Sequence, residues 1–500
     1  MRLAGREQIA GRLGRAVLAE GSAAAPRVPT WVRSAVATGF ALAAGVAGPA
    51  SAQIHTLQDA LASAYENNPQ IQAGRAQLRS TDEGVPQALA GWRPTIVVSG
   101  SAGYGEGTYR SFFQGFGGGG GQYFKQPNER TIYQGTATVT QPLYQGGRTQ
   151  AQTHQATNQV YSQRAQLNVT EEQLFVDTVN AYVGVITSEQ LLQLNQNNEQ
   201  VLREQLRATQ DRFRVGEITR TDVAQAEAAL AGASATVQTA QGNVQTARAT
   251  YVRTIGEYPQ PNLVKPQPLA LPVRNEAEAD QLAATNNPNV IAAEFTEAAA
   301  KDAVDVAFSQ LMPQVSVQAQ GAREDNTTVT RTRIIGAQVL VNASVPLYQG
   351  GAEYSRVRQA RQNVEQSTRL VENARRTSIQ AATQAWETLT AARATIESTR
   401  AAIRANQVAL EGTEREAIVG SRTTLDVLNA QQALLNSQVT LVQNLSSLIT
   451  ASYSVAFAIG RLTARDLNLN VPLYDDTAYY RAVKDRLFGT GDYATGQPGR

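Results

Sequence analysis

The chain has 500 residues, 17% of them charged, and a formal net charge of +2. Residues 1–52 hold six Arg and two Glu, so the remaining body is close to neutral and shows no electrostatic footprint for nucleic acid. The chain has no Cys, which excludes disulfides, thiolate metal sites, thiol nucleophiles and a lipid-modified cysteine anchor.

The first predicted element is a signal peptide over residues 1–52. Arg27 and Arg33 precede an apolar stretch from Ala35 to Ala47, and Ala50-Ser51-Ala52 has the small-x-small pattern of a cleavage site. A transmembrane anchor is the alternative, but the stretch is short and weakly hydrophobic. The sequence therefore predicts export from the cytoplasm.

Four strands are predicted next, in two pairs, and a helix precedes each pair. The two helices are expected over Leu57–Leu89 and Glu276–Leu311. Four segments alternate with period two, and each has about the 9–11 residues that a tilted strand needs to cross a bilayer. These segments are Pro94–Tyr104, Thr131–Leu143, Pro313–Gly321 and Ile335–Leu347.

The two faces of these strands differ in polarity. In the fourth segment Val339 and Val341 lie on one face, and Gln338 and Asn342 lie on the other. The polar faces carry Gln, Ser, Thr and Asn with almost no charge, as suits a water-filled lumen. A β-sandwich with one solvated face is the alternative, because it gives the same alternation.

Long polar tips between paired strands favour a membrane barrel over the sandwich. They cover Gly105–Arg130 and Ala322–Arg331. The first holds the run Gly117–Gly121, which lacks the Lys-Ser/Thr of a phosphate loop. Four strands cannot close a barrel, so the chain is expected to oligomerise. Two copies would supply eight strands and three would supply twelve, and composition does not choose between them.

Two very long helices follow the strand pairs. They are predicted over Thr149–Arg214 and Ala352–Ile418, each roughly 100 Å long at ~1.5 Å per residue. Each ends at Val-Gly, where Gly216 and Gly420 suit a left-handed helix cap. A second helix then begins, over Thr221–Ile255 or Thr424–Ile459, with Thr221 and either Thr423 or Thr424 as N-caps. In the last helix Leu428, Leu435, Val442, Ile449 and Ala456 recur every seven residues, and Leu434, Leu441 and Leu448 form a second row beside them. Two adjacent rows predict that this helix contacts neighbours on both sides, although an isolated coiled-coil dimer could give the same pattern.

The chain repeats itself with a period of about 200 residues. QPLYQGG at Gln141–Gly147 returns as VPLYQGG at Val345–Gly351, and RFRVGEITRTDV at Arg212–Val223 faces EAIVGSRTTLDV at Glu416–Val427. We therefore predict two structural repeats, residues 53–272 and 273–460. Residues 461–500 form a peripheral C-terminal periplasmic tail, whose Gly-rich end from Gly489 is expected to be mobile.

Enzyme chemistry is not indicated. His55 and His154 are the only His residues and neither lies in a ligand-like cluster. No nucleotide, metal or nucleophile motif occurs, so we expect no catalytic residue, no metal and no cofactor.

The repeated motifs carry a family resemblance. QPLYQGG, RFRVGEITRTDVAQAEAAL, VPLYQGGAEYSRVRQA and VGSRTTLDVLNAQQALLNSQ resemble the TolC family of outer-membrane channel proteins, in particular the branch that serves type I secretion. The resemblance implies a membrane α+β fold: a homotrimer whose twelve-stranded β-barrel, with four strands per chain, is continuous with a long α-helical barrel in the periplasm.

The resemblance also implies the function and partners. The chain would be the outer-membrane exit duct of a tripartite export system, docked through a periplasmic adaptor to an inner-membrane ABC or proton-driven transporter. Protein secretion is the leading interpretation and small-molecule efflux is the alternative. A non-conducting envelope protein with a coiled-coil stalk is the competing class.

By motif position, the resemblance places a gate at the two helical turns. Arg422 matches the family's gating arginine, and Thr221 and Asp222 match its hydroxyl and acidic partners. Asp426 matches the first position of an acidic entrance ring. The second ring position holds Asn429, and Ala417 replaces a tyrosine of the closed tip, so this chain departs from the family twice. The alternative for Arg422 and Asp222 is an ordinary surface ion pair, which contributes little.

Overall fold

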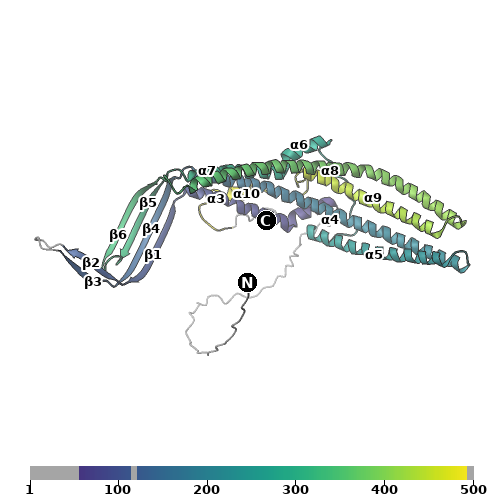
Figure 1. Cartoon of the computed structure of the whole chain (residues 1–500), viewed down its shortest axis with the longest axis horizontal. Coiled ribbons are helices and arrows are strands. Elements are labelled where there is room, and N and C mark those ends of the chain that lie inside the picture. The colour runs from purple at the N-terminus through teal and green to yellow at the C-terminus, as the bar shows by residue number, and fades with distance from the viewer. Residues whose placement is uncertain (1–55, 114–120, 492–500) are drawn as a thin grey trace, which may run out of the picture. The chain divides into compact units, whose positions relative to one another are not determined.

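The computed structural model describes residues 56–113 and 121–491, and Figure 1 shows its elements. The predicted signal peptide and the end of the predicted tail lie outside the described residues, as does most of the glycine run. Within residues 56–113 and 121–491, every helix is too short or too polar to cross a membrane.

One four-stranded antiparallel sheet contains the predicted strands. β1 (Thr95–Gly105), β4 (Arg130–Tyr144), β5 (Gln314–Asp325) and β6 (Arg333–Ser344) pair in the order β1-β4-β5-β6. Figure 1 shows the four strands side by side, with β1 and β6 at the edges. The four strand predictions are confirmed to within a few residues at each end.

The strand register places the predicted apolar faces on one side of the sheet. Ile96 pairs with Val139, Val139 with Ala319, and Ala319 with Val339. Cross-strand partners point to the same face, so these four side chains form one apolar row across the sheet. The other face carries polar contacts, such as the 3.0 Å bond from Gln338 Nε2 to Gln320 Oε1.

The first strand pair extends beyond the sheet, which differs from the sequence expectation. Residues 105–130 were expected to be a polar loop, but β2 (Thr108–Phe113) pairs with β3 (Gln122–Pro127). The Phe112 and Tyr123 rings lie 5.0 Å apart between centroids. Aromatic cross-strand pairs stabilise antiparallel strands, and the nearby glycine-rich composition obscured this signal.

Both helices predicted ahead of the strand pairs are broken in the structure. The first divides into α1 (Leu57–Asn67), α2 (Pro69–Asp82), α3 (Gly84–Leu89) and the short 3₁₀ helix η1 (Ala90–Trp92). The second divides into α6 (Glu276–Asn286) and α7 (Pro288–Ser309).

An Asn-Pro step causes the main break in each repeat. Asn68 and Asn287 have extended backbone, and each side-chain oxygen accepts a bond from the backbone N–H two residues on, at 2.8 Å and 2.9 Å. Proline disfavours helical backbone in the residue before it and suits the first position of a new helix. The prediction of two continuous helices is therefore wrong at Asn68 and Asn287.

The long helices occur where the sequence predicts them. They are α4 (Arg148–Arg214) and α8 (Ala352–Ile418), each of 67 residues, followed by α5 (Arg220–Ile255) and α9 (Thr424–Ala458). α4 runs beside α5, and α8 runs beside α9 (Figure 1). α9 also packs against α4, which gives it neighbours on two sides as the heptad pattern predicts.

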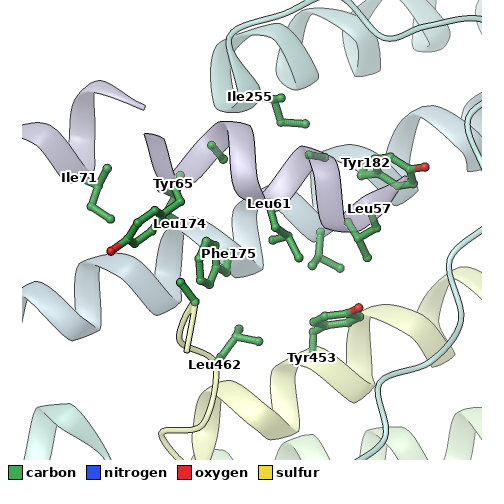
Figure 2. Packing of buried hydrophobic residues seen from close by; sticks show 14 of the residues in the cluster. Leu57, Leu61, Tyr65, Ile71, Leu174, Phe175, Tyr182, Ile255, Tyr453 and Leu462 are labelled. Atoms are coloured by element: carbon green, nitrogen blue, oxygen red, sulfur yellow. The ribbon is translucent and has the colours of Figure 1, made fainter. Parts of the chain in front are cut away.

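The main core joins the first helices, α4 and the segment after α9 (Figure 2). Tyr65, Phe175, Tyr182 and Leu462 are buried there, with the last three at 0% exposure. The Glu171 carboxylate accepts a 2.7 Å bond from the backbone N–H of Ala464. The expectation of a peripheral tail is thus wrong for the segment that begins at Leu462, because this segment is part of the core. The short helix α10 (Ala478–Val483) follows later in the tail.

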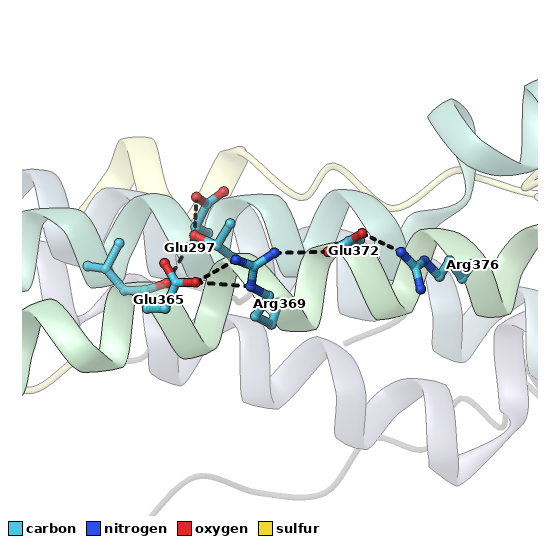
Figure 3. A network of polar contacts seen from close by, with 7 residues as sticks. Glu297, Glu365, Arg369, Glu372 and Arg376 are labelled. Atoms are coloured by element: carbon cyan, nitrogen blue, oxygen red, sulfur yellow. Dashed lines mark hydrogen bonds and ion pairs between the residues drawn. The ribbon is translucent and has the colours of Figure 1, made fainter.

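Ion pairs run along the exposed face of α8. Figure 3 shows Arg369 between Glu365 and Glu372, and Arg376 on the far side of Glu372, at helical spacings of three and four residues. Because these groups are exposed, water weakens the pairs and they contribute little to stability. The face is best understood as a solvated helix surface.

Candidate functional site

The two helical turns named by the sequence share one backbone design. At the end of α4, the N–H of Glu217 bonds to the Arg212 carbonyl at 3.0 Å, and Gly216 has φ +80°. At the end of α8, the N–H of Ser421 bonds to the Glu416 carbonyl at 2.9 Å, and Gly420 has φ +78°. A Cβ is unfavourable at such φ values, so glycine is the residue suited to reverse the chain here.

Each turn leads into its second helix through a capping box. Thr219 is the N-cap of α5, and its hydroxyl donates to Asp222 Oδ2 at 2.6 Å while the Asp222 N–H donates back to Thr219 Oγ1 at 3.3 Å. Thr423 and Asp426 repeat the arrangement in α9 at 2.8 Å and 3.3 Å. The prediction of Thr221 as an N-cap is therefore wrong, because Thr219 is three residues before the acidic partner. Thr423 is confirmed as the cap of α9.

These contacts set the electrostatics of both carboxyl groups. Hydrogen bonds from the Thr219 hydroxyl and backbone N–H lower the pKa of Asp222. Bonds from the Thr423 backbone N–H and hydroxyl lower the pKa of Asp426. Both side chains therefore remain ionised well into acidic solution.

Arg422 has its own partner within the turn. Its Nε donates to Glu416 Oε2 at 2.9 Å, and this bond raises the pKa of the Arg422 guanidinium. The first turn has an equivalent pair, Arg212 Nε with Glu217 Oε2 at 2.9 Å. Within the described residues of one chain, Arg422 pairs with Glu416 and not with Asp222. A contact between neighbouring helix pairs of an assembly stays a prediction.

The other predicted site residues lie on the same two turns. Thr221 is exposed in the first turn of α5, and Asn429 is exposed one turn beyond Asp426 in α9. Ala417 is buried, with 9% of its surface exposed, near the end of α8. Sequence reasoning missed Thr219 and Glu416. The Thr-x-x-Asp spacing could have identified Thr219, whereas no local pattern identifies Glu416.

A hollow of about 600 Å³ lies between the two helix pairs, along the helices that lead to and from the turns. α4 and α5 line one side and α9 lines the other, with Asn198, Leu202, Gln431 and Leu435 among the lining residues. Gln431 Nε2 approaches Asn198 Oδ1 at 3.4 Å. In the part of the chain that the structure describes, no group of His, Asp and Glu has the arrangement of a metal site.

Comparison with known proteins decides the family. The model of the outer membrane efflux protein family matches residues 60–257 and 280–461, one stretch in each repeat. The chain belongs to the outer membrane efflux protein family. The localisation predicted from the sequence, the cell outer membrane, is confirmed.

Two relatives and one solved structure illustrate the family. The outer membrane efflux protein BepC of Brucella suis is 34% identical over 91% of this chain and 96% of its own length. The alkaline protease secretion protein AprF of Pseudomonas aeruginosa is 24% identical over 69% of this chain and 73% of its own. The structure of CusC superposes with a TM-score of 0.69 at 14% identity, covering 81% of this chain and 92% of that one.

These comparisons confirm the TolC family resemblance and the fold class. The fold is the membrane α+β fold of an outer-membrane channel, with four strands of each chain in one sheet and an internal repeat. The chain is an outer-membrane channel protein of tripartite export systems, and the names of its relatives cover both efflux and secretion.

Proposed function

We propose that three copies of the chain close a twelve-stranded barrel in the outer membrane, continuous with a helical tunnel through the periplasm. The edges of the sheet support this assembly. β1 and β6 each have one side without a strand partner among the described residues. Unpaired backbone groups are costly in lipid, so each edge needs a strand from a neighbouring copy.

The exposed apolar face supports the same assembly. Ile96 is 71% exposed, Val98 78% and Val339 70% in a single chain. Lipid around a closed barrel would cover these side chains, while the opposite face would line an aqueous lumen.

Cross-linking tests the copy number directly, because the natural chain has no Cys. A Cys at Ser99 in β1, combined in turn with Cys at Gln338, Leu340 or Asn342 in β6, scans the junction between copies. We expect at least one pair to give a covalent trimer. Products that stop at a dimer would contradict the proposal.

The proposed role is a passive exit duct for type I protein secretion. It would receive its cargo from an inner-membrane transporter through a periplasmic adaptor. The similarity to a protein named for alkaline protease secretion supports this role. Small-molecule efflux is the second candidate, and the 34% identity to a protein named as an efflux protein favours it.

One complementation experiment separates the two candidates. The chain is expressed in a host that lacks its own channel of this family, once with a secretion transporter and adaptor and once with a drug transporter and adaptor. Protein in the medium would support the secretion role, and restored drug resistance alone would support the efflux role. Absence of conductance by the purified protein in a planar bilayer would instead support the envelope-protein class.

A gate at the helical turns is part of the proposal. Arg422 would bond to Asp222 and Thr221 of a neighbouring helix pair, with Asp426 and Asn429 at the entrance ring. Two observations support it. The Thr219 bonds go to Oδ2 of Asp222, which leaves Oδ1 for another donor. The Arg422 side chain is 54% exposed, and its terminal nitrogens are not used by the Nε bond to Glu416.

A further inference from the structure

The apolar face of the sheet ends in arginines at the end farthest from the long helices. The register continues the rows: Gly100, Gly135, Arg323 and Ile335 form one row, and Ala102, Tyr133, Asp325 and Arg333 form the next. Cross-strand partners share a face, so Arg323 and Arg333 lie on the same face as the apolar row of Ile96 and Val339. Charged side chains thus share these two rows with the exposed apolar side chains of Ile335 and Tyr133.

The Asp325 carboxylate accepts one hydrogen bond from Arg323 and one from Arg333, which leaves the other N–H donors of each guanidinium available. The Nε of Arg323 donates to Asp325 Oδ2 at 3.0 Å, and the Nε of Arg333 donates to Asp325 Oδ1 at 2.6 Å. Each guanidinium keeps its two terminal nitrogens for another acceptor, and the two side chains are 58% and 62% exposed. One carboxylate faces two guanidinium groups, so the cluster keeps a positive charge.

A hollow of about 950 Å³ lies beside this cluster. Gly100 and Gly135 are among the residues that line it, and a Cβ built at Gly135 would meet no atom within 4 Å. Arg331 adds a third guanidinium to the lining.

The adjoining turn holds the charged side of the hollow in place. The backbone N–H of Asn326 donates to the Thr332 carbonyl at 2.7 Å, and its side-chain oxygen accepts from the Thr332 N–H at 3.2 Å. The Asn326 amide also donates to the Thr131 carbonyl of β4 at 3.0 Å. The turn that carries Arg331 and Arg333 is thereby tied to the sheet.

We infer that this hollow binds the phosphate of an anionic lipid in the outer leaflet of the membrane. Guanidinium groups match the geometry of phosphate oxygens and bind them bidentately. The apolar rows directly beside the arginines offer a surface for the acyl chains of the same molecule, which a free phosphate ion would not use. The inference rests on the proposed assignment of the apolar face to lipid.

Native mass spectrometry of the detergent-purified full-length protein tests the site. Phosphatidic acid is the probe, and diacylglycerol with the same acyl chains is its phosphate-free counterpart. We expect the parent to retain phosphatidic acid and not diacylglycerol. The double variant Arg323→Gln/Arg333→Gln should bind roughly tenfold or more weakly, since it loses the charge-assisted bonds.

Two single variants make the test specific. Gly135→Val fills the hollow with every arginine intact and should also weaken retention. Arg130→Gln removes a cation of β4 whose register position puts it on the opposite face, and should bind like the parent. Equal retention by the parent, the double variant and Gly135→Val would overturn the inference. Displacement of the lipid by an equal concentration of inorganic phosphate would overturn it too, in favour of a simple anion site.

Conductance of the same samples separates this inference from the proposed function. The double variant should conduct like the parent, because the arginines lie on the face away from the lumen. A parent that retains phosphatidic acid without conducting would refute the proposed exit duct and leave the lipid site standing.

Discussion

The sheet and the helical core differ in how far their apolar side chains are exposed in a single chain. Phe175, Tyr182 and Tyr251 are completely buried between helices of one chain, whereas Val98 and Val339 in the sheet are more than two-thirds exposed. The helical core is therefore complete within the chain. The sheet becomes stable only when lipid and neighbouring strands cover it, since exposed apolar surface and open edges are unfavourable. The difference teaches that folding and membrane assembly depend on separate sets of residues.

The largest expected effect comes from opening a cavity in the helical core. Phe175 is fully buried and its ring lies 6.2 Å from that of Tyr65. Phe175→Ala should lower the free energy of unfolding by ~3–5 kcal/mol, through lost transfer energy and an unfilled cavity. Val339→Ala is the matched control in the sheet, where lipid can fill the space. The midpoint temperature of thermal unfolding in detergent is the measurement. An equal decrease for the two variants would contradict the proposed difference between the helical core and the sheet.

Charge on the apolar face should prevent assembly, while charge on the polar face should not. Val339→Arg places a guanidinium toward lipid. This costs ~2–4 kcal/mol of folding free energy if the residue lies near the middle of the bilayer. Gln338→Arg changes the next residue, which faces the lumen in the proposed barrel. We expect a sharp loss of membrane yield for the first variant and normal yield for the second. Equal yields would contradict the assignment of the faces.

The helical core should also become less stable as the pH rises from 5 to 8. Burial raises the pKa of Glu172 to about 8 from its ordinary value of 4.5, and the carboxyl group approaches the Leu462 N–H at 3.4 Å. A raised carboxyl pKa adds stability below the ordinary value, and this stability is lost as pH rises through the folded value. Between pH 5 and 8 the free energy of unfolding should therefore fall, on the order of 1 kcal/mol per pH unit.

Glu172→Gln should remove part of that slope. Asp82, whose pKa burial raises to about 7, supplies another part, and Asp82→Asn should remove it independently. Thermal midpoints measured at pH 5 and pH 8 for the three proteins provide the check. An unchanged slope in Glu172→Gln would show that this carboxyl group does not control the stability of the core.

The smallest effects belong to the helical turns, which are exposed and depend on an assembly. If Arg422 and Asp222 latch neighbouring helix pairs, Arg422→Ala and Asp222→Ala should each raise single-channel conductance by a few-fold. The double variant should add little to either, because both changes remove one contact. Asp426→Ala should change cation selectivity and leave the latch closed.

Two controls separate the latch from the capping boxes. Thr219→Ala weakens the cap of α5 by ~1 kcal/mol and leaves the Asp222 carboxylate in place, so conductance should stay near that of the parent. Glu416→Ala frees Arg422 from its partner in the turn and should favour the closed state. Conductance that rises in Thr219→Ala as much as in Asp222→Ala would assign the effect to helix capping.

Local patterns predicted most of the elements. The absence of Pro and the near-absence of Gly over 67 residues were enough to predict α4 and α8, and period-two alternation predicted the four strands of the sheet. The breaks at Asn68 and Asn287 were missed although Asn-Pro is a known signal. The prediction of Thr221 as the cap overlooked Thr219, which lies three residues before Asp222.

The sequence by itself determined the lengths of α4 and α8, the apolar face of each strand and the glycines at both turns, because period, breakers and left-handed backbone are local properties. Only the tertiary structure decided the strand order β1-β4-β5-β6 and the burial of Leu462 near Glu172 of α4, 290 residues earlier in the chain. It also decided that Arg422 meets Glu416 and that Arg323 and Arg333 share Asp325. Such contacts depend on how the chain turns and on which strands become neighbours, and no periodicity along the sequence records either.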